Sequence, residues 1–139
     1  MTSYSGRRLR NYVGAKLWAK AEFRNVLNHY PGHSGDARGG DKWPIELARA
    51  SASVMKHELN GAYVMFVGKH VADAFGIHSE FNQYFIANAF HCWSQGGVGG
   101  FFEFQVIPHP SGVNRWWNDR KNRATARRFF KSLRASLRG

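Results

Sequence analysis

The stretch AYVMFVGKHVADAFG, residues 62–76, decides the fold class of this chain. Its first six residues form an unbroken apolar run. Such a run is typical of a strand covered on both faces, and therefore of a central strand in a parallel or mixed sheet. Gly68-Lys69 ends the strand, and VADAF continues as a short helix up to Gly76. A buried strand followed directly by a helix favours an α/β fold.

The residues before this strand predict two helical regions and a loop. Residues 6–24 carry two apolar stripes at helical spacing on either side of Gly14, which predicts two short helices or one broken helix. FRNVLN (23–28) is a candidate short strand, and the Gly- and Asp-rich residues 29–43 predict a loop. Pro44 stands where a first helical residue belongs. The helix that it starts carries one apolar face, made of Ala48, Ala52, Met55 and Leu59.

The residues after the strand predict a hairpin and a final helix. Within residues 81–107, YFIANAFHCW and FFEFQVI flank the glycine-rich SQGGVGG, which indicates two strands joined by a turn. Residues 120–139 predict a helix with two stripes. The apolar stripe is Ala126, Phe130, Leu133 and Leu137, and the basic stripe is Arg120, Arg123, Arg127, Lys131, Arg134 and Arg138. The order of elements favours an α/β sandwich with a small sheet, in one domain over residues 1–139.

Composition points to a basic protein of a reducing compartment. The 139 residues carry a net charge of +11, from 20 Lys and Arg against 9 Asp and Glu. Such a field attracts polyanions, so nucleic acid is the expected partner; the plain alternative is solubility. With one cysteine, Cys92, the chain can form no internal disulfide and no Cys-based zinc site. No segment has the apolar length of a membrane span, and no secretory signal is evident. We expect a cytoplasmic location, in a bacterium or a phage-infected cell.

The stretch VIPHPSGVNRWWND, residues 106–119, holds the densest group of candidate functional residues. A short apolar run stops at Pro108, and Pro, Ser, Gly and Asn are ordinary turn residues. A turn does not require the histidine, the arginine or the paired tryptophans. In an α/β sheet, ligands gather at the carboxyl ends of strands, and this stretch leaves such an end.

HPSGVN resembles the second active-site motif of the uracil-DNA glycosylase superfamily, and HPSGVNRWWND is similar to a variant in glycosylase-like proteins of bacteria and phages. VMFVGKHVADAFG, SGRRLRNYVG and FRNVLN resemble the superfamily's third strand, first helix and second strand. The resemblance implies a three-layer α/β/α sandwich with a small, mostly parallel sheet. It also implies a DNA glycosylase that hydrolyses the N-glycosidic bond of uracil or a modified pyrimidine, with no cofactor and no metal.

The chain departs from that pattern at its start, because only five residues precede Gly6. The superfamily places a strand and a catalytic loop before this helix, and the loop carries the carboxylate or amide that activates water. We expect a relative shortened at the N-terminus, one part of a split protein, or a fold retained for another use. A second copy or a partner chain could complete the sheet at the open position. Asp36 and Asp41 could replace the lost carboxylate, or be solvated loop residues.

The resemblance gives His109 the role of donating a hydrogen bond to the base as negative charge develops there. The alternative is a histidine that caps the loop. Ser111 and Gly112 could hold a phosphate or form a plain turn, and Val113 could fill the gap left by an extruded base or be buried in the turn. Asn114 belongs to the same candidate DNA-binding loop.

Arg115 could bind phosphate, and Trp116 could stack on an unpaired base. We expect one of the adjacent tryptophans 116 and 117 in the core and the other at the DNA surface. Asn118 or Asp119 is placed to cap the final helix.

Four further residues complete the candidate site. Asn28 could read the base edge or occupy a turn, and Lys69 could lie near a phosphate. Arg123 and Arg127, on the basic stripe, could follow the DNA backbone or form a solvated face. His29 and His33 lack a third metal ligand, so no metal site is predicted. Two functions therefore stand side by side: a glycosylase-type enzyme, and a non-catalytic nucleic-acid-binding protein on the same fold.

Overall fold

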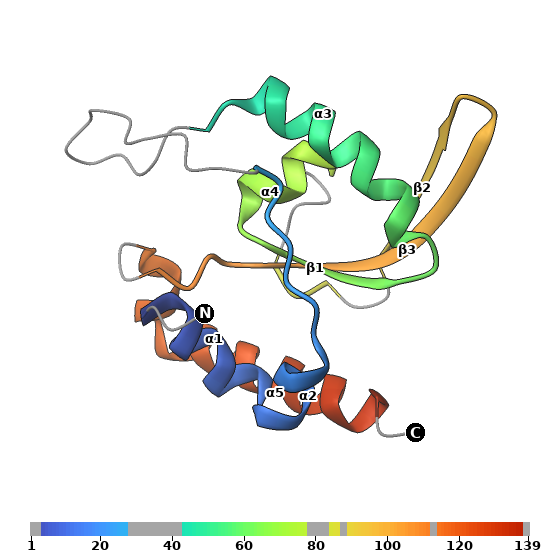
Figure 1. The fold of residues 1–139 in the computed structure, drawn as a ribbon. Helices are drawn as coiled ribbons and strands as arrows, with labels where there is room; N and C mark the ends of the chain where they lie inside the picture. Colours follow the sequence, from blue (N-terminus) through green and yellow to red (C-terminus); the bar gives the residue numbers. More distant parts are fainter. Residues whose placement is uncertain (1–3, 28–42, 78–83, 87–88, 112–113, 138–139) are drawn as a thin grey trace. The chain divides into compact units, whose positions relative to one another are not determined.

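The computed structural model describes residues 4–27, 43–77, 84–86, 89–111 and 114–137. The chain divides into two compact units (Figure 1). Met1–Phe23 and Pro108–Gly139 form the first, which we call the helical unit, and Arg24–Ile107 forms the second, the sheet unit. The expectation of one domain over residues 1–139 stays a prediction.

The sheet unit contains a small mixed sheet of three strands among its described residues. These strands are β1 (Tyr63–Val67), β2 (Ala89–Gln95) and β3 (Val98–Ile107), in the order β1-β3-β2. β1 runs parallel to β3, and β2 runs antiparallel to it. Because β1 and β3 are parallel, they end at the same edge, where the Gly68 N–H donates to the Ile107 carbonyl at 2.8 Å. The chain therefore has the predicted α/β class.

The central position in this sheet belongs to β3, so the prediction of a central strand over 62–67 is wrong for the described residues. β1 has one neighbour there, and only Phe66 of its five residues is fully buried. The ten residues of β3 are long enough to pair with both other strands, and five of its last six are buried. An apolar run marks a strand that meets the core, but its place in the sheet depends on which other strands reach it.

The predicted hairpin is confirmed, but its first strand begins at Ala89, and residues 84–86, which were predicted to belong to it, form no strand. β2 and β3 are joined through Gly96 and Gly97, whose φ angles are 59° and 79°. Positive φ at both central residues is the geometry of the two-residue turn that matches the twist of paired strands, and glycine adopts it without strain.

Two helices lie together on one side of the sheet (Figure 1). α3 (Ile45–Met55) begins one residue after the predicted start and continues as the 3₁₀ helix η1 (Lys56–Leu59), and α4 (Lys69–Ala74) follows β1. The predicted apolar face of α3 is confirmed at Ala48 and Ala52, which are fully buried. Their small side chains let the helix approach a core of aromatic rings, made of Phe66, Phe75, Phe102 and Phe104.

The prediction of a strand over FRNVLN is wrong for residues 23–27, which form no strand. Val26 is instead a buried core residue, and the half-buried Leu27 packs against the same core. A strand requires a neighbour to receive its backbone hydrogen bonds, and among the described residues no strand pairs with this segment.

The helical unit contains α1 (Tyr4–Val13), α2 (Ala15–Lys20), the 3₁₀ helix η2 (Arg115–Asn118) and α5 (Arg120–Leu137). The predicted break at Gly14 is confirmed, because Gly14 adopts φ 91° and ψ 148°, a conformation essentially reserved for glycine. α1 and α5 contact each other. Ala126, Phe130 and Leu133 are buried, which confirms the apolar stripe of the last helix at these positions. Within the described ranges, no helix is both long and apolar enough to cross a membrane.

Candidate nucleic-acid interface

The segment from Pro108 to Asp119, here called the motif loop, is held by hydrogen bonds that converge on His109. The His109 carbonyl accepts from Asn114 Nδ2 and from Trp117 Nε1, each at 3.0 Å. The Ser111 N–H donates to His109 Nδ1 at 3.2 Å. Both the main chain and the ring of His109 are therefore fixed by the loop that follows it.

This hydrogen bonding sets the chemistry of the His109 ring. Because Nδ1 accepts a hydrogen bond, the proton of the neutral ring is on Nε2. Desolvation by burial lowers the pKa of His109 below its ordinary value. The ring is therefore neutral at neutral pH and offers one N–H donor at Nε2. The alternative was a histidine that caps the loop by bonding a backbone carbonyl; in the structure the ring contacts the loop backbone by accepting the Ser111 N–H instead.

The other loop residues divide between holding the loop and facing outward. Asn114 uses both ends of its amide within the loop, since Oδ1 accepts from the Trp116 N–H at 3.1 Å and Nδ2 donates to His109. Arg115 is exposed, and Ser111 is half-buried. Asn114 thus positions the loop, while Arg115 is available to a ligand.

The two tryptophans differ in burial as predicted, and the structure shows which one is in the core. Trp117 is 1% exposed and packs against Tyr12 of α1, with ring centroids 4.9 Å apart. Trp116 is half-buried and meets Trp117 edge to face. Trp116 is therefore the tryptophan with surface left for a ligand.

α5 is joined to the motif loop at its first turn. Asp119 Oδ1 accepts from the Lys121 N–H at 2.8 Å, so Asp119, one of the two residues predicted for this role, caps the helix. Arg123 Nη1 donates to the Trp117 carbonyl at 2.8 Å. Arg123 was predicted to bind DNA, and in the structure its guanidinium also holds η2 against α5.

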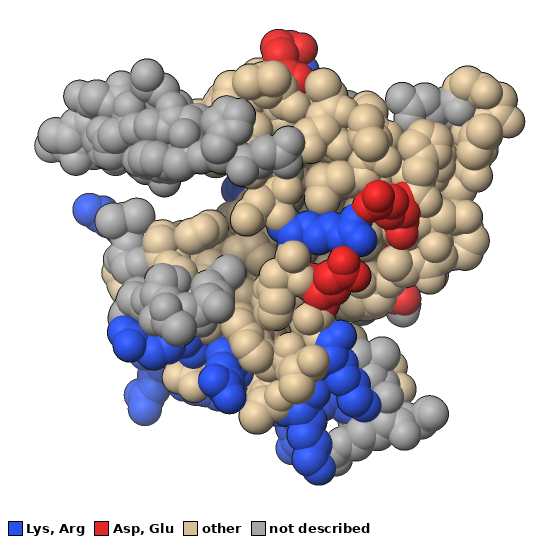
Figure 2. Space-filling view, viewed as in Figure 1, with Lys and Arg blue, Asp and Glu red and all other residues tan. Residues whose placement is uncertain are grey.

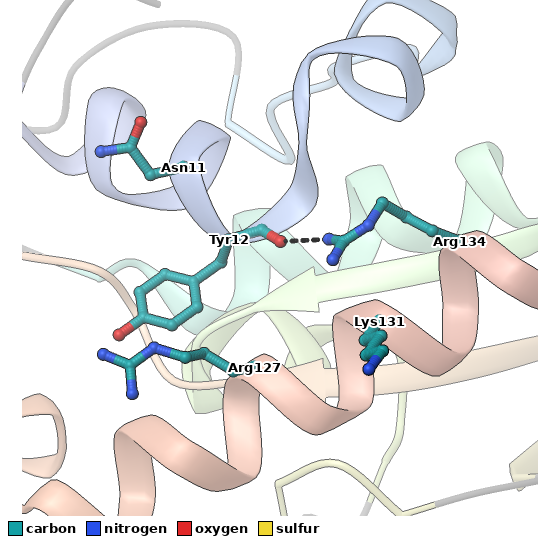
Figure 3. A pocket seen from close by; sticks show the side chains of 5 residues that line it. All are labelled: Asn11, Tyr12, Arg127, Lys131 and Arg134. Carbon is teal, nitrogen blue, oxygen red and sulfur yellow. Dashed lines mark hydrogen bonds between the residues drawn. The ribbon is translucent and has the colours of Figure 1, made fainter.

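The basic stripe of α5 lines a hollow of about 500 Å³ against α1. Its lining consists of Asn11, Tyr12, Arg127, Lys131 and Arg134 (Figure 3). Sequence reasoning placed Arg127, Lys131 and Arg134 on one stripe but missed Asn11 and Tyr12. No local signal identifies those two residues, because they end a helix far away in the sequence.

Positive charge is concentrated in the helical unit. This unit holds 14 of the 20 Lys and Arg but only two of the nine acidic residues, Glu22 and Asp119. The sheet unit holds six Lys and Arg against seven acidic residues. The helical unit therefore carries a net charge of +12 and the sheet unit −1, and Figure 2 shows Lys and Arg gathered over the helices of the helical unit.

The remaining predicted residues belong to the sheet unit or lie outside the described residues. Lys69 belongs to the sheet unit, where it is exposed and lies 5.3 Å from the ring centre of Tyr84. Asn28, Gly112 and Val113 lie outside the described residues, as do His29, His33, Asp36 and Asp41. The structure brings together His109, Ser111, Asn114, Arg115, Trp116, Arg123 and Arg127 within the helical unit.

The described residues contain no group of three His, Cys, Asp or Glu side chains that could hold a metal ion. Comparison with known protein families, curated proteins and solved structures finds no match to this chain.

Proposed function

We propose that this protein binds nucleic acid, and DNA in the first place, through its helical unit. The observation that carries the proposal is the concentration of charge: 14 Lys and Arg against two acidic residues in one compact unit. A surface of one sign attracts a polyanion by releasing the counterions condensed on it. Solubility alone does not require one unit to carry the whole excess while the other is nearly neutral. The single cysteine agrees with a reducing cytoplasm as the site of this binding.

A second function, release of a base from DNA, is favoured by the state of His109. Cleavage of an N-glycosidic bond places negative charge on the departing base, and a fixed N–H donor stabilises that charge. His109 offers such a donor at Nε2, because Ser111 occupies Nδ1 and desolvation keeps the ring neutral. The likeness of HPSGVN to the uracil-DNA glycosylase motif makes uracil or a modified pyrimidine the proposed base. The matching fold would be a three-layer sandwich with a mostly parallel sheet.

Binding without catalysis is favoured by the composition of the helical unit, which holds His109 and two acidic residues, Glu22 and Asp119. Of the two acidic residues of the helical unit, Asp119 already accepts the Lys121 N–H at the start of α5. Hydrolysis requires a group that activates or positions water. A partner chain that completes the sheet beside β1 could supply that group. Elution of the protein from a sizing column at the mass of a dimer or of a complex would support such a partner, and elution as a monomer would count against it.

The test uses single- and double-stranded oligonucleotides that carry uracil or 5-substituted uracils. Abasic sites are cleaved with alkali after incubation, and binding is measured over a range of salt concentrations. Base release that is lost in His109→Gln and kept in His57→Gln, a change at an exposed histidine of the sheet unit, supports the enzyme. Binding that weakens with salt but releases no base supports the binding protein. Absence of salt-dependent binding would overturn the proposal.

A further inference from the structure

The hollow between α1 and α5 presents mainly donors and positive charge to whatever enters it. Three of its five lining residues are cations, one is a phenol and one is an amide, and none is acidic. All five belong to the helical unit, so the hollow is formed within one compact part of the chain. At about 500 Å³ it has room for a phosphate group together with the sugar attached to it.

One of the three cations is fixed by the protein itself. Arg134 Nη1 donates to the Tyr12 carbonyl at 2.8 Å and to the Val13 carbonyl at 3.2 Å. These carbonyls end α1, where the helix dipole is negative, so a guanidinium is favoured there. The Arg134 side chain therefore forms a preorganised positive wall of the hollow, close to the turn at Gly14.

The other two cations are not fixed in this way in the described part of the chain. Arg127 and Lys131 are exposed, stand one helical turn apart, and belong to none of the ion pairs between described residues. Like charges at this spacing destabilise a helix. Figure 3 shows the Arg127 guanidinium and the Tyr12 phenol directed to the same side of the hollow. An anion at this position would remove the repulsion and accept hydrogen bonds from both groups.

We propose that this hollow is a phosphate-binding site that takes one phosphate of the nucleic acid. The proposal rests on the proposed function for the source of the phosphate, and on the geometry of the hollow for its place. Arg127 supplies a planar pair of donors, Lys131 a mobile ammonium, and Tyr12 a hydroxyl; together they suit the oxygens of a phosphate. Arg127 and Lys131 then make direct contact with the phosphate, and Arg134 adds the charge of the fixed wall.

The test compares two double variants that remove the same charge from the same helix. Arg127→Gln/Lys131→Gln removes the positive charge of the two lining cations other than Arg134. Lys121→Gln/Arg128→Gln removes two exposed cations that do not line it. Circular dichroism checks that both variants are folded. The first probe is inorganic tripolyphosphate, added to ¹⁵N-labelled protein, with the amide signals of Asn11, Tyr12, Arg127 and Lys131 as the readout.

Tripolyphosphate should shift these four signals in the wild type and in the control variant, and not in the Arg127/Lys131 variant. With oligonucleotides, two lost phosphate contacts should lower the slope of log affinity against log salt by about 1.4 for single strands or about 1.8 for duplexes. The control variant should change the slope by less than half as much. Oligonucleotides with and without a 5′-phosphate distinguish the sources: tighter binding of the phosphorylated strand identifies a terminal phosphate, and equal binding identifies a phosphate within the chain.

The two proposals fail in different ways. Equal loss of affinity in both double variants, or tripolyphosphate shifts outside the hollow, would overturn the phosphate site and leave nucleic-acid binding intact. If the wild type binds no nucleic acid while tripolyphosphate still shifts the four signals, the proposed function fails and the anion site stands.

Discussion

Replacement of Trp117 by phenylalanine tests whether the motif loop is held by the hydrogen bond of a buried indole. Trp117 is 1% exposed, and its Nε1 donates to the His109 carbonyl at 3.0 Å. Phenylalanine keeps an aromatic ring against Tyr12 but removes this donor. The His109 carbonyl keeps its second donor, Asn114 Nδ2, so the change leaves no buried acceptor without a partner.

The expected cost follows from two terms. Loss of one hydrogen bond costs about 0.5–1.5 kcal/mol when the acceptor retains another donor. The smaller ring also leaves about two fewer buried carbon atoms, at about 0.8 kcal/mol each. We therefore expect Trp117→Phe to lower the free energy of unfolding by about 2–3 kcal/mol.

Urea unfolding followed by far-ultraviolet circular dichroism measures this cost. Trp116→Phe is the matched control, because it makes the same chemical change at the adjacent, half-buried residue, and it should cost about 1 kcal/mol or less. The His109 ring resonance should also shift in Trp117→Phe, since the loop loses one of its three hydrogen bonds to this residue. A cost for Trp117→Phe below about 0.5 kcal/mol, or a larger cost for Trp116→Phe, would refute the reasoning.

Three further outcomes are expected. Gly14→Ala should destabilise the protein by about 1–3 kcal/mol in urea unfolding, because φ is 91° and the new Cβ would lie 3.2 Å from Arg134 Cδ; an unchanged midpoint would contradict the strain. Asp119→Ala should cost about 1 kcal/mol by removing the cap on the Lys121 N–H, and Asp119→Asn should restore most of it. The His109 ring should titrate below about pH 6.5 by NMR, with its signal assigned through His109→Gln. Because folding lowers this pKa, the neutral ring contributes fully to the free energy of unfolding above about pH 6.5, and this contribution is lost as the pH falls through the folded-state pKa. A titration midpoint above about pH 6.5 would mean the opposite pH dependence.

The sequence by itself determined the features that depend on local backbone preference and on periodicity. Glycine tolerates positive φ, so Gly14 marked the break between two helices and the glycine-rich SQGGVGG marked the hairpin turn, which the structure places at Gly96 and Gly97. The 3.6-residue period of apolar side chains identified α3 and α5, and the pair Asn118 and Asp119 marked the capped start of α5. Each of these signals acts over a few residues, and each appears unchanged in the structure.

The tertiary structure alone decided which distant groups meet. β3 rather than β1 is central because a strand's place depends on partners some forty residues away, as in the pairing of Tyr63 with Glu103. Trp117 rather than Trp116 is buried because Tyr12 packs against it. Arg134 reaches carbonyls at the end of α1, and the same helix contact brings Asn11 beside the basic stripe. Residue type and spacing determine the local structure of each segment. The hydrogen bonds and contacts that form a site join segments that are distant in the sequence, and neither segment's local sequence indicates which other segment it will meet.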